Sequence, residues 1–422
     1  MAEETKQITV SIIGPGSRGL DTYGNYLLNC PDMKIVAVLG NRKRRVDYAL
    51  QKLNLPDTCG YTDEDEFFKE KRSDVAIITS PDSCHYRHLR KCLILGYDIL
   101  MEKPVCNNYA EYEKLLQLRK QHNNKVMVGY VLRYLPAIQQ VMEYLKNGEI
   151  GELQGISHME QVNVKDFIHS YVRGRWADQN TSSNTLLAKC SHDLDLIHSF
   201  ICASLGKDTS QHMSYGVKID EKDLTFALRN APANTSSYCL DCEHCFTCPY
   251  NAYDFYYRGW KEKGKPEDQY PYNTICEAPV TADKIMEAIQ TSDYGRCVYS
   301  CDNNAPDFVS VNITCYNNGY PQILSNLIMN GLSARGGRII KLYGNKGEID
   351  YDEEQGNIYV KYLTGETKKI QINTYNTKGG YSHSLADECM MDAFIKYIRG
   401  DESANLTSLE GSYQSHLFVF ES

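Results

Sequence analysis

Short apolar runs alternate with helix-like stretches over residues 8–129. The runs read ITVSIIG, KIVAVLG, VAIITS, DILMEKP and KVMVGYV. This rhythm is typical of βαβ units. The runs are rich in Val and Ile and lack polar alternation, which indicates strands covered by helices on both faces. We therefore expect an α/β fold whose first domain, residues 1–130, is built on a doubly wound parallel sheet.

A glycine-rich loop follows the first run directly. Gly14, Gly16 and Gly19 form G-x-G-x-x-G between the strand and a predicted helix. Such glycines allow a tight turn and a close approach of the backbone to a pyrophosphate, and the helix N-terminus attracts its negative charge. The loop predicts a Rossmann domain that binds NAD(P), with Ser17 and Arg18 also beside the cofactor.

The end of the second run bears on the choice between NAD and NADP. NAD-binding domains usually place a carboxylate there for the ribose 2′-hydroxyl. This chain has Gly40 and Asn41, followed by Arg42 and three further cations. Because cations accommodate a 2′-phosphate, NADP is favoured over NAD, with Asn41 and Arg42 as cofactor contacts. The alternative is a solvated basic helix start.

The end of the third run borders the expected nicotinamide site. Thr79, Ser80 and Pro81 lie there, and we expect all three beside the cofactor. His85 either faces the pocket or caps the following helix, and Asp82 has the same two interpretations. His85 is included among the predicted cofactor contacts.

The fourth run ends in Glu102, Lys103 and Pro104. A lysine at the C-terminal end of such a strand enters the crevice in which doubly wound folds bind their ligands. Desolvation and a neighbouring positive charge lower the pKa of an amine, which makes it a usable general acid or base. Lys103 is therefore the predicted catalytic residue. Glu102 either orients it or stays on the sheet side, and both residues are expected to contact the cofactor.

The remaining residues, 131–422, are expected to form a second, α+β domain. Candidate strands such as GISHMEQVNV, FVSVNITCY and IIKLYG alternate with turn signals, including GNKGE. Such turns join antiparallel strands, so we expect a large, mostly antiparallel open sheet. A Tyr- and Cys-rich stretch of low periodicity, about 223–302, is read as an insertion.

The insertion contains the pattern C-x-x-C-x-x-C-x-x-C-P. Cys239, Cys242, Cys245 and Cys248 form it. Paired C-x-x-C spacing suits a tetrahedral metal, whereas the bacterial iron–sulfur pattern has three residues before its last cysteine. A structural metal, disulfides or free thiols, and an iron–sulfur cluster remain open alternatives.

Composition excludes several functions. The net charge of −9 argues against nucleic-acid binding, which needs a surplus of Lys and Arg. No apolar run approaches the roughly 18 residues that span a bilayer. The first residues, MAEETKQ, do not resemble a secretory signal. We expect a cytoplasmic protein with a small-molecule substrate and no membrane or nucleic-acid partner.

Motifs along nearly the whole chain resemble the glucose-fructose oxidoreductase/inositol dehydrogenase (Gfo/Idh/MocA) family. They read, in order, GPGSRG, SPDSCH, MEKP, GYVLRYLP, HSYVRGRW, LLAKCSHDLDLI, DYGRCVYSCDN and IIKLYGNKGEI. The resemblance implies an NAD(P)-dependent oxidoreductase acting on a hydroxyl or ketone of a sugar, cyclitol or sugar derivative. It also implies a homodimer or homotetramer formed through the C-terminal sheet.

The resemblance assigns roles to individual residues. Lys103 is implied to move the substrate proton, and His192 is implied to be the second catalytic residue, which lies close to the reacting hydroxyl and orients the substrate. Many polyol dehydrogenases of the family carry Asp four residues before this histidine, where this chain has Ala188. Lys189 is expected to supply a polar contact in its place. The other expected substrate contacts are Tyr130, Arg133, Arg173 and Trp176.

Resembling sequences also keep a cysteine-rich element together with Cys297. This makes a structural zinc the first expectation for the cysteine pattern. Its ligands would be Cys239, Cys242, Cys248 and one of Cys245 or Cys297.

Two other functions remain open beside the dehydrogenase. One is a redox-neutral, NAD-dependent glycosidase of the same fold. The other is a non-catalytic cofactor-binding sensor, to which the missing carboxylate at Ala188 gives some weight, while Lys103 and His192 count against it.

Overall fold

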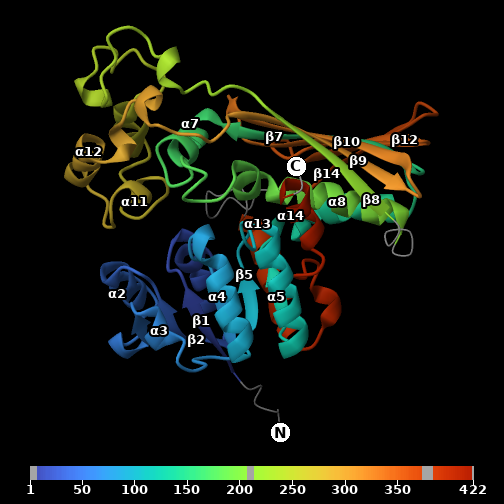
Figure 1. Ribbon diagram of the computed structural model, residues 1–422, viewed down its shortest axis with the longest axis horizontal. Coiled ribbons are helices and arrows are strands. Elements are labelled where there is room, and N and C mark those ends of the chain that lie inside the picture. The colour runs from blue at the N-terminus through green and yellow to red at the C-terminus, as the bar shows by residue number, and fades with distance from the viewer. Residues whose placement is uncertain (1–6, 207–212, 373–383, 421–422) are drawn as a thin grey trace.

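The computed structural model describes residues 7–206, 213–372 and 384–420, and it contains two sheets (Figure 1). The first has six strands in the order β3-β2-β1-β4-β5-β6, and every pair in it is parallel. The strands are β1 Ile8–Ile13, β2 Met33–Leu39, β3 Gly60–Tyr61, β4 Val75–Ile78, β5 Asp98–Met101 and β6 Val126–Val128. The Rossmann arrangement expected from the sequence is confirmed.

Helices cover both faces of this parallel sheet. They are η1 Ser17–Gly24, α1 Asn25–Leu28, α2 Lys43–Lys52, α3 Glu64–Phe67, α4 Asp82–Leu95 and α5 Tyr109–His122. All four residues of β4 are buried, as the lack of polar alternation indicates. Strand order reverses between β1 and β4, and ligands of such folds bind in the crevice at this point.

The second sheet has eight strands in the order β14-β13-β12-β11-β7-β10-β9-β8. Only β7 and β10 pair in parallel among these strands, so the sheet is mostly antiparallel, as expected. Its strands are β7 Leu153–Asn163, β8 Met213–Glu221, β9 Phe308–Asn317, β10 Tyr320–Ser333, β11 Gly337–Gly344, β12 Gly347–Asp352, β13 Asn357–Tyr362 and β14 Thr367–Gln371.

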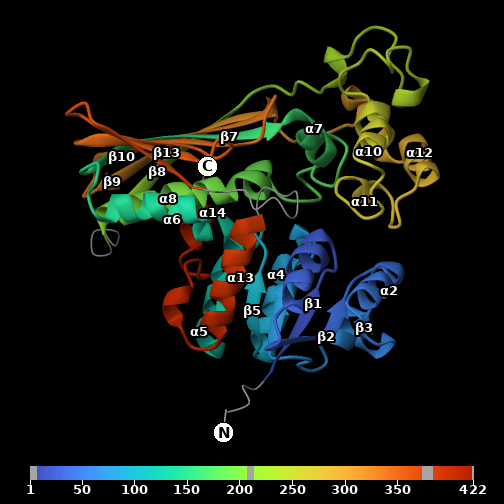
Figure 2. The same ribbon diagram turned by 180° about the vertical axis from the view of Figure 1, so that it is seen from behind.

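Helices cover one face of the eight-stranded sheet. Helices α6 Pro136–Lys146 and α8 Ser191–Leu205 lie beneath it, between the sheet and the nucleotide-binding domain (Figure 2). The other face carries partly exposed apolar side chains, among them Leu324 and Tyr343. Within the described residues, no helix is both long and apolar enough to cross a membrane.

The cysteine-rich insertion has a small core of its own. Its helices include η8 Tyr253–Arg258, α10 Gly259–Glu262, α11 Tyr272–Ile275 and α12 Ala282–Thr291. Tyr256, Trp260 and Ile289 pack together inside it. Figure 1 shows these helices on the same side of the molecule as α2. Burial of apolar side chains therefore stabilises a segment that the sequence shows only as irregular.

The C-terminal residues return to the nucleotide-binding domain. Helices α13 Ser384–Ile398 and α14 Tyr413–Phe420 flank a segment that pairs with β6. The Val128 amide donates to Thr407 O at 2.8 Å, and Tyr112 Oη donates to Leu409 O at 2.9 Å. Leu409 is fully buried in the core of the first domain. The first domain, predicted to consist of residues 1–130, thus also includes residues from the C-terminal part of the chain.

Candidate active site

A cleft of about 1440 Å³ lies between the nucleotide-binding domain, the second sheet and the insertion. It opens at the carboxyl ends of β4 and β5, beside the strand-order reversal. The structure brings together in it the predicted residues Gly16, Ser17, Arg18, Thr79, Ser80, His85, Glu102, Lys103, Trp176, Lys189 and His192. The predicted residues that do not line it are Gly14, Gly19, Asn41, Arg42, Pro81, Tyr130, Arg133 and Arg173.

The first and third glycines of the loop serve close packing. Gly14 has a φ of +98°, and a Cβ there would lie 2.5 Å from the Ser80 nitrogen. A Cβ on Gly19 would lie 2.4 Å from Thr79 Oγ1. The same hydroxyl donates to Gly14 O at 2.6 Å. Both glycines therefore hold the loop against the end of β4.

The second glycine faces the cleft and fits a dinucleotide. Only an Arg45 nitrogen, 3.9 Å away, comes within 4 Å of a Cβ placed on Gly16. Gly16 is also the N-cap of η1, and no side chain caps this end of the helix. Open space in front of glycine backbone, at the positive end of a helix, suits a pyrophosphate. The residues present thus fit a nicotinamide dinucleotide.

The cations that reach the cleft from α2 are not those expected. Asn41 and Arg42 lie before the helix and outside the cleft lining, whereas Arg44 and Arg45 line it. Because α2 begins at Lys43, its first turn directs the later residues of the basic run toward the cleft. The sequence shows the basic run, but not which of its members line the cleft.

Arg18 is held by other side chains of the protein. Its guanidinium donates to Glu102 Oε1 at 2.6 Å and to both oxygens of Asp387 at 2.8 Å. Tyr23 Oη also donates to Glu102 Oε1, at 2.6 Å. Burial raises the pKa of Glu102, but Arg18 and Tyr23 outweigh it and hold the pKa below its usual value. Arg18 therefore joins the glycine loop to the lysine-bearing strand and to α13.

Lys103 extends into the cleft at the carboxyl end of β5. Its Nζ donates to Ala188 O at 2.6 Å. Burial lowers the pKa of Lys103, and Lys189 and Arg18 lower it further against the opposing effect of Glu102 and Asp82. An amine with a lowered pKa can exchange a proton at a lower pH than an exposed lysine. Lys103 Nζ thus contacts the main-chain oxygen of Ala188, the position at which the family resemblance would lead us to expect an Asp carboxylate.

His192 lies in the first turn of α8 and lines the cleft. The ring of Tyr130 packs edge-on against it, with 5.7 Å between centroids. Tyr130 is fully buried, and its hydroxyl contacts Ser415 at 3.2 Å. Arg133 likewise turns away from the cleft and pairs with Asp195 at 3.5 Å. Tyr130 and Arg133, expected as substrate contacts, instead support α8 from behind.

Lys189 belongs to a buried cluster of charges in the cleft wall. Its Nζ pairs with Glu160 at 2.8 Å. Arg338 pairs with Glu160 at 3.2 Å, with Asp193 at 2.8 Å and with Glu353 at 3.3 Å. Burial lowers the pKa of Lys189, but Glu160 outweighs it and raises the pKa above its usual value. Glu160 and Arg338 have no local sequence signal, because strands β7 and β11 bring them together.

Trp176 joins the second domain to the first helix turn after β4. Its Nε1 donates to Asp82 Oδ2 at 2.8 Å, and Ser183 Oγ donates to the same oxygen at 2.6 Å. The indole stacks on Tyr171, and Arg175 lies over its ring. Burial raises the pKa of Asp82, while the surrounding donors and positive groups hold it below its usual value. Asp82 therefore acts as a buried acceptor between the domains.

His85 lines the cleft, but both ring nitrogens contact the protein's own carbonyl oxygens. Nδ1 lies 2.6 Å from Pro104 O, and Nε2 lies 2.8 Å from Ser80 O. The imidazole is 1% exposed. His85 thus ties the end of β4 to the segment after Lys103, which is a structural position.

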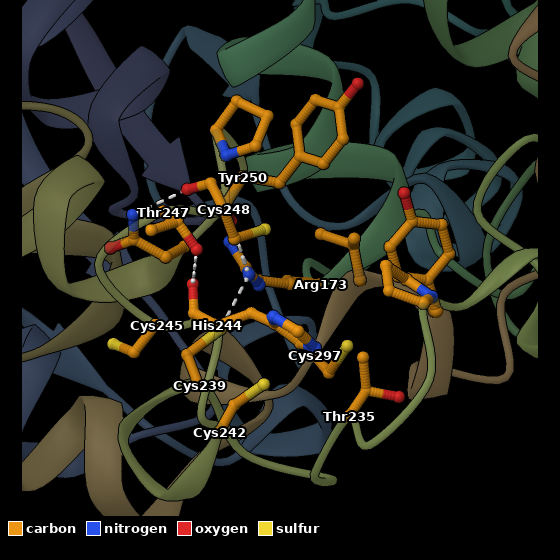
Figure 3. A pocket seen from close by; sticks show the side chains of 15 residues that line it. Arg173, Thr235, Cys239, Cys242, His244, Cys245, Thr247, Cys248, Tyr250 and Cys297 are labelled. Carbon is orange, nitrogen blue, oxygen red and sulfur yellow. Dashed lines mark hydrogen bonds between the residues drawn. The ribbon is translucent and has the colours of Figure 1, made fainter.

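Arg173, expected as a sugar contact, lies in the wall of a different cavity of about 220 Å³ (Figure 3). Its Nε donates to Arg296 O at 2.8 Å. Its Nη2 donates to Tyr250 O at 2.9 Å and to Cys239 Sγ at 3.3 Å. The side chain is 3% exposed, so Arg173 anchors the cysteine-rich loop to the second domain.

The five predicted metal ligands line this second cavity. They are Cys239, Cys242, Cys245, Cys248 and Cys297, and all are free thiols. Figure 3 shows them on neighbouring turns around the Arg173 guanidinium. Among residues 7–206, 213–372 and 384–420, however, no three His, Cys, Asp or Glu side chains are arranged to hold a metal ion. In this arrangement the thiols do not fit a zinc.

Comparison with known proteins supports the assignment of the first domain. Residues 8–130 match the family described as "Oxidoreductase family, NAD-binding Rossmann fold". Trans-1,2-dihydrobenzene-1,2-diol dehydrogenase of Mus musculus is 29% identical over 121 residues, which cover 29% of this chain and 36% of that protein. The scyllo-inositol 2-dehydrogenase (NADP(+)) IolW of Bacillus subtilis is 24% identical over 189 residues, which cover 44% and 50%. The matches thus span half or less of these relatives.

A solved structure extends the likeness to the whole fold. The scyllo-inositol dehydrogenase from Lactobacillus casei, with bound cofactor NAD(H) and scyllo-inositol, superposes with a TM-score of 0.63 at 15% identity. The superposition covers 98% of this chain and 96% of that one. Residues 8–130 are thus similar to the NAD-binding domain of the Gfo/Idh/MocA oxidoreductases.

Proposed function

We propose that the protein is an NAD(P)-dependent oxidoreductase that interconverts a hydroxyl and a ketone on a sugar, cyclitol or sugar derivative. One observation carries the proposal. The amine of the half-buried Lys103 lies at the carboxyl end of β5, in the same cleft as the open backbone of Gly16 and the imidazole of His192. This arrangement supports a role for Lys103 in proton transfer, with the proposed dinucleotide site on one side and a polar wall on the other.

In the oxidative direction, Lys103 Nζ accepts the proton of the substrate hydroxyl. The bound nicotinamide supplies the hydride acceptor for the same carbon. Lys103 must be neutral to accept the proton, and its lowered pKa favours this form. His192 holds the reacting oxygen by a hydrogen bond, and Tyr130 behind it fixes the ring orientation. In the reductive direction, the protonated Lys103 donates to the nascent alkoxide.

Support for a carbohydrate-type substrate comes from the cleft wall and from the relatives. Lys189 and Glu160 offer a donor and an acceptor beside the catalytic amine, which suits a polyhydroxylated ligand. IolW is named as an enzyme of scyllo-inositol, and the Lactobacillus casei structure contains scyllo-inositol.

A substrate screen tests the proposal. Cyclitols, aldoses, sugar acids and glycosides are incubated with NAD or NADP, and formation of the reduced cofactor is followed by its absorbance. We expect a stoichiometric signal with at least one substrate class, and Lys103→Met should lower it by about 100-fold or more. Lys34→Met, at an exposed position on β2 outside the cleft, is the matched control. A Lys103→Met enzyme within about threefold of wild type would refute the catalytic role.

The same screen separates the two alternatives. Cleavage of a glycoside without net reduction of the cofactor would identify the redox-neutral glycosidase. Binding of the dinucleotide with no turnover of any substrate would identify a sensor.

The expected zinc and oligomeric state need separate measurements. Elemental analysis of untagged protein should give about one zinc per chain if the cysteines bind it, and less than about one-tenth would exclude the site. A homodimer or homotetramer formed through the open face of the second sheet should appear in light scattering. Tyr343→Lys on that face should then favour the monomer.

A further inference from the structure

The insertion brings a carboxylate to the end of the cleft where α2 begins. Strand β2 ends at Leu39, and the two residues that follow, Gly40 and Asn41, supply no carboxylate. Glu277, from the segment between α11 and α12, lines the cleft beside Arg44. Its Oε2 lies 2.6 Å from Arg44 Nη1. A negative group therefore reaches the nucleotide-binding domain from a segment more than two hundred residues away in the chain.

A second contact holds the insertion at this place. Asp268 Oδ2 accepts from Tyr48 Oη at 2.5 Å and from Lys52 Nζ at 2.9 Å. Lys52 also pairs with Asp21 of η1 at 2.7 Å. Tyr48 and Lys52 lie on the same helix as Arg44, so α2 is joined to the insertion along its length. Figure 1 shows α11 above α2.

In Rossmann domains, the charges near the end of β2 bear on which dinucleotide is accepted. A carboxylate near the end of β2 favours the free 2′-hydroxyl of NAD, whereas arginines there favour the 2′-phosphate of NADP. Arg44 and Arg45 both line the cleft. By themselves, these two cations would favour NADP. Glu277 pairs with one nitrogen of the largely exposed Arg44 guanidinium, and it adds a negative charge to the end of the cleft that a 2′-phosphate would approach.

We propose that Glu277 is a cofactor-specificity residue that makes the protein prefer NAD over NADP. It performs from the insertion the role that a carboxylate at the end of β2 performs in other Rossmann domains. The basic run 42–45 alone indicates the opposite preference, because the sequence does not show which side chain faces Arg44. This inference rests on the proposed dinucleotide binding, and it adds to that proposal the choice between the two cofactors.

Direct binding tests the inference without a known substrate. NADH and NADPH are titrated into the full-length protein, and binding is followed by quenching of tryptophan fluorescence. We expect wild type to bind NADH at least about tenfold more tightly than NADPH. Glu277→Gln should tighten NADPH binding by about tenfold, because the repulsion is removed and Arg44 is released. Binding of NADH should change by less than about threefold.

Two further variants make the test specific. Arg44→Met combined with Glu277→Gln should lose the gained affinity for NADPH, since the released guanidinium is then absent. Glu70→Gln is the control: it breaks an Arg–Glu pair with Arg72 that lies in the nucleotide-binding domain but outside the cleft. It should leave the affinities for NADH and NADPH unchanged.

Each remaining outcome overturns a distinct statement. Equal or tighter binding of NADPH by wild type would overturn the inference, as would an unchanged NADH-to-NADPH ratio in Glu277→Gln, while the proposed function would stand. Failure of wild type to bind either dinucleotide would overturn both.

Discussion

Replacement of Asp193 by asparagine tests the buried charge cluster of the cleft wall. The Asp193 carboxylate accepts from Arg338 Nε at 2.8 Å and lies 2.7 Å from His158 Nε2. Asp193 is fully buried, and Arg338 is 5% exposed. Asparagine keeps the shape of the side chain but removes its charge, so the guanidinium loses one of its three carboxylate partners.

The expected loss of unfolding free energy follows from this geometry. Removal of one partner from a buried ion pair costs about 3–5 kcal/mol, because the other charge remains desolvated. Arg338 still has Glu160 at 3.2 Å and Glu353 at 3.3 Å, so we expect the lower end, about 3 kcal/mol. Arg338→Met should cost more, since it leaves three carboxylates facing one another. The double variant should be more stable than the sum of the single effects by about 0.5–3 kcal/mol.

The pH dependence of the unfolding free energy tests the same charge cluster independently. Burial raises the pKa of Asp193, but Arg338 and His158 outweigh it and hold the pKa well below its usual value. A group with a lowered folded-state pKa contributes stability that is complete above its unfolded pKa of about 4 and is lost as the pH falls through the folded value. Stability of Asp193→Asn should therefore fall less steeply in acid than that of wild type.

Urea unfolding followed by tryptophan fluorescence provides the measurement. The chain's two tryptophans, Trp176 and Trp260, both lie outside the nucleotide-binding domain, so the signal reports on the part that contains the cluster. Asp220→Asn, which breaks an exposed pair with Lys218 on β8, should change stability by less than about 1 kcal/mol. A loss below about 1 kcal/mol in Asp193→Asn itself would refute the reasoning from buried charge.

Three further predictions concern the cofactor and the catalytic amine. The profile of kcat/KM against pH in the oxidative direction should rise at a pH below the usual lysine value of about 10.4, since burial lowers the pKa of Lys103, and a rise at or above that value would contradict the assignment. Asp387→Asn should weaken NADH binding by about threefold to tenfold in fluorescence titrations, because Arg18 and the glycine loop lose a buried partner, whereas unchanged binding would separate this contact from the cofactor site. Gly16→Ala should leave the melting temperature nearly unchanged but weaken NADH binding by about tenfold or more. Gly19→Ala should lower the melting temperature, since its Cβ would lie 2.4 Å from the Thr79 hydroxyl. The reverse pattern would contradict the roles assigned to the two glycines.

The central strands were predictable because burial imposes a simple composition on them. Strands β1, β2, β4, β5 and β6 coincide with apolar runs that need no partner to be recognised. Strands β3, β8, β12 and β14 are not among the strands that the sequence predicts, and the exposed sequence TKKIQ of β14 shows no apolar pattern. The insertion was read as irregular because its core joins aromatic side chains from several short helices rather than one periodic face.

The residues of the candidate site also fall into those that the sequence predicts and those that it does not. Local signals identified the glycine loop and Lys103, because a strand end and its following turn lie within a few residues of one another. Asp387, Arg338 and Glu277 carry no such signal, since each reaches the cleft from an element distant in sequence. The sequence therefore predicts the site residues that lie at strand ends and in the following turns. Their partners from distant elements become known only from the tertiary structure.

The return of the chain to the nucleotide-binding domain bears on how the protein is made. The edge of β6 is completed by Thr407 and Ser408, and the adjoining core is closed by Leu409. Domains generally fold in order from the N-terminus as the ribosome releases them. Here the first domain to emerge must wait, with an apolar site open, until nearly three hundred further residues have been translated. During that interval we expect the open apolar site to favour misassociation and capture by chaperones.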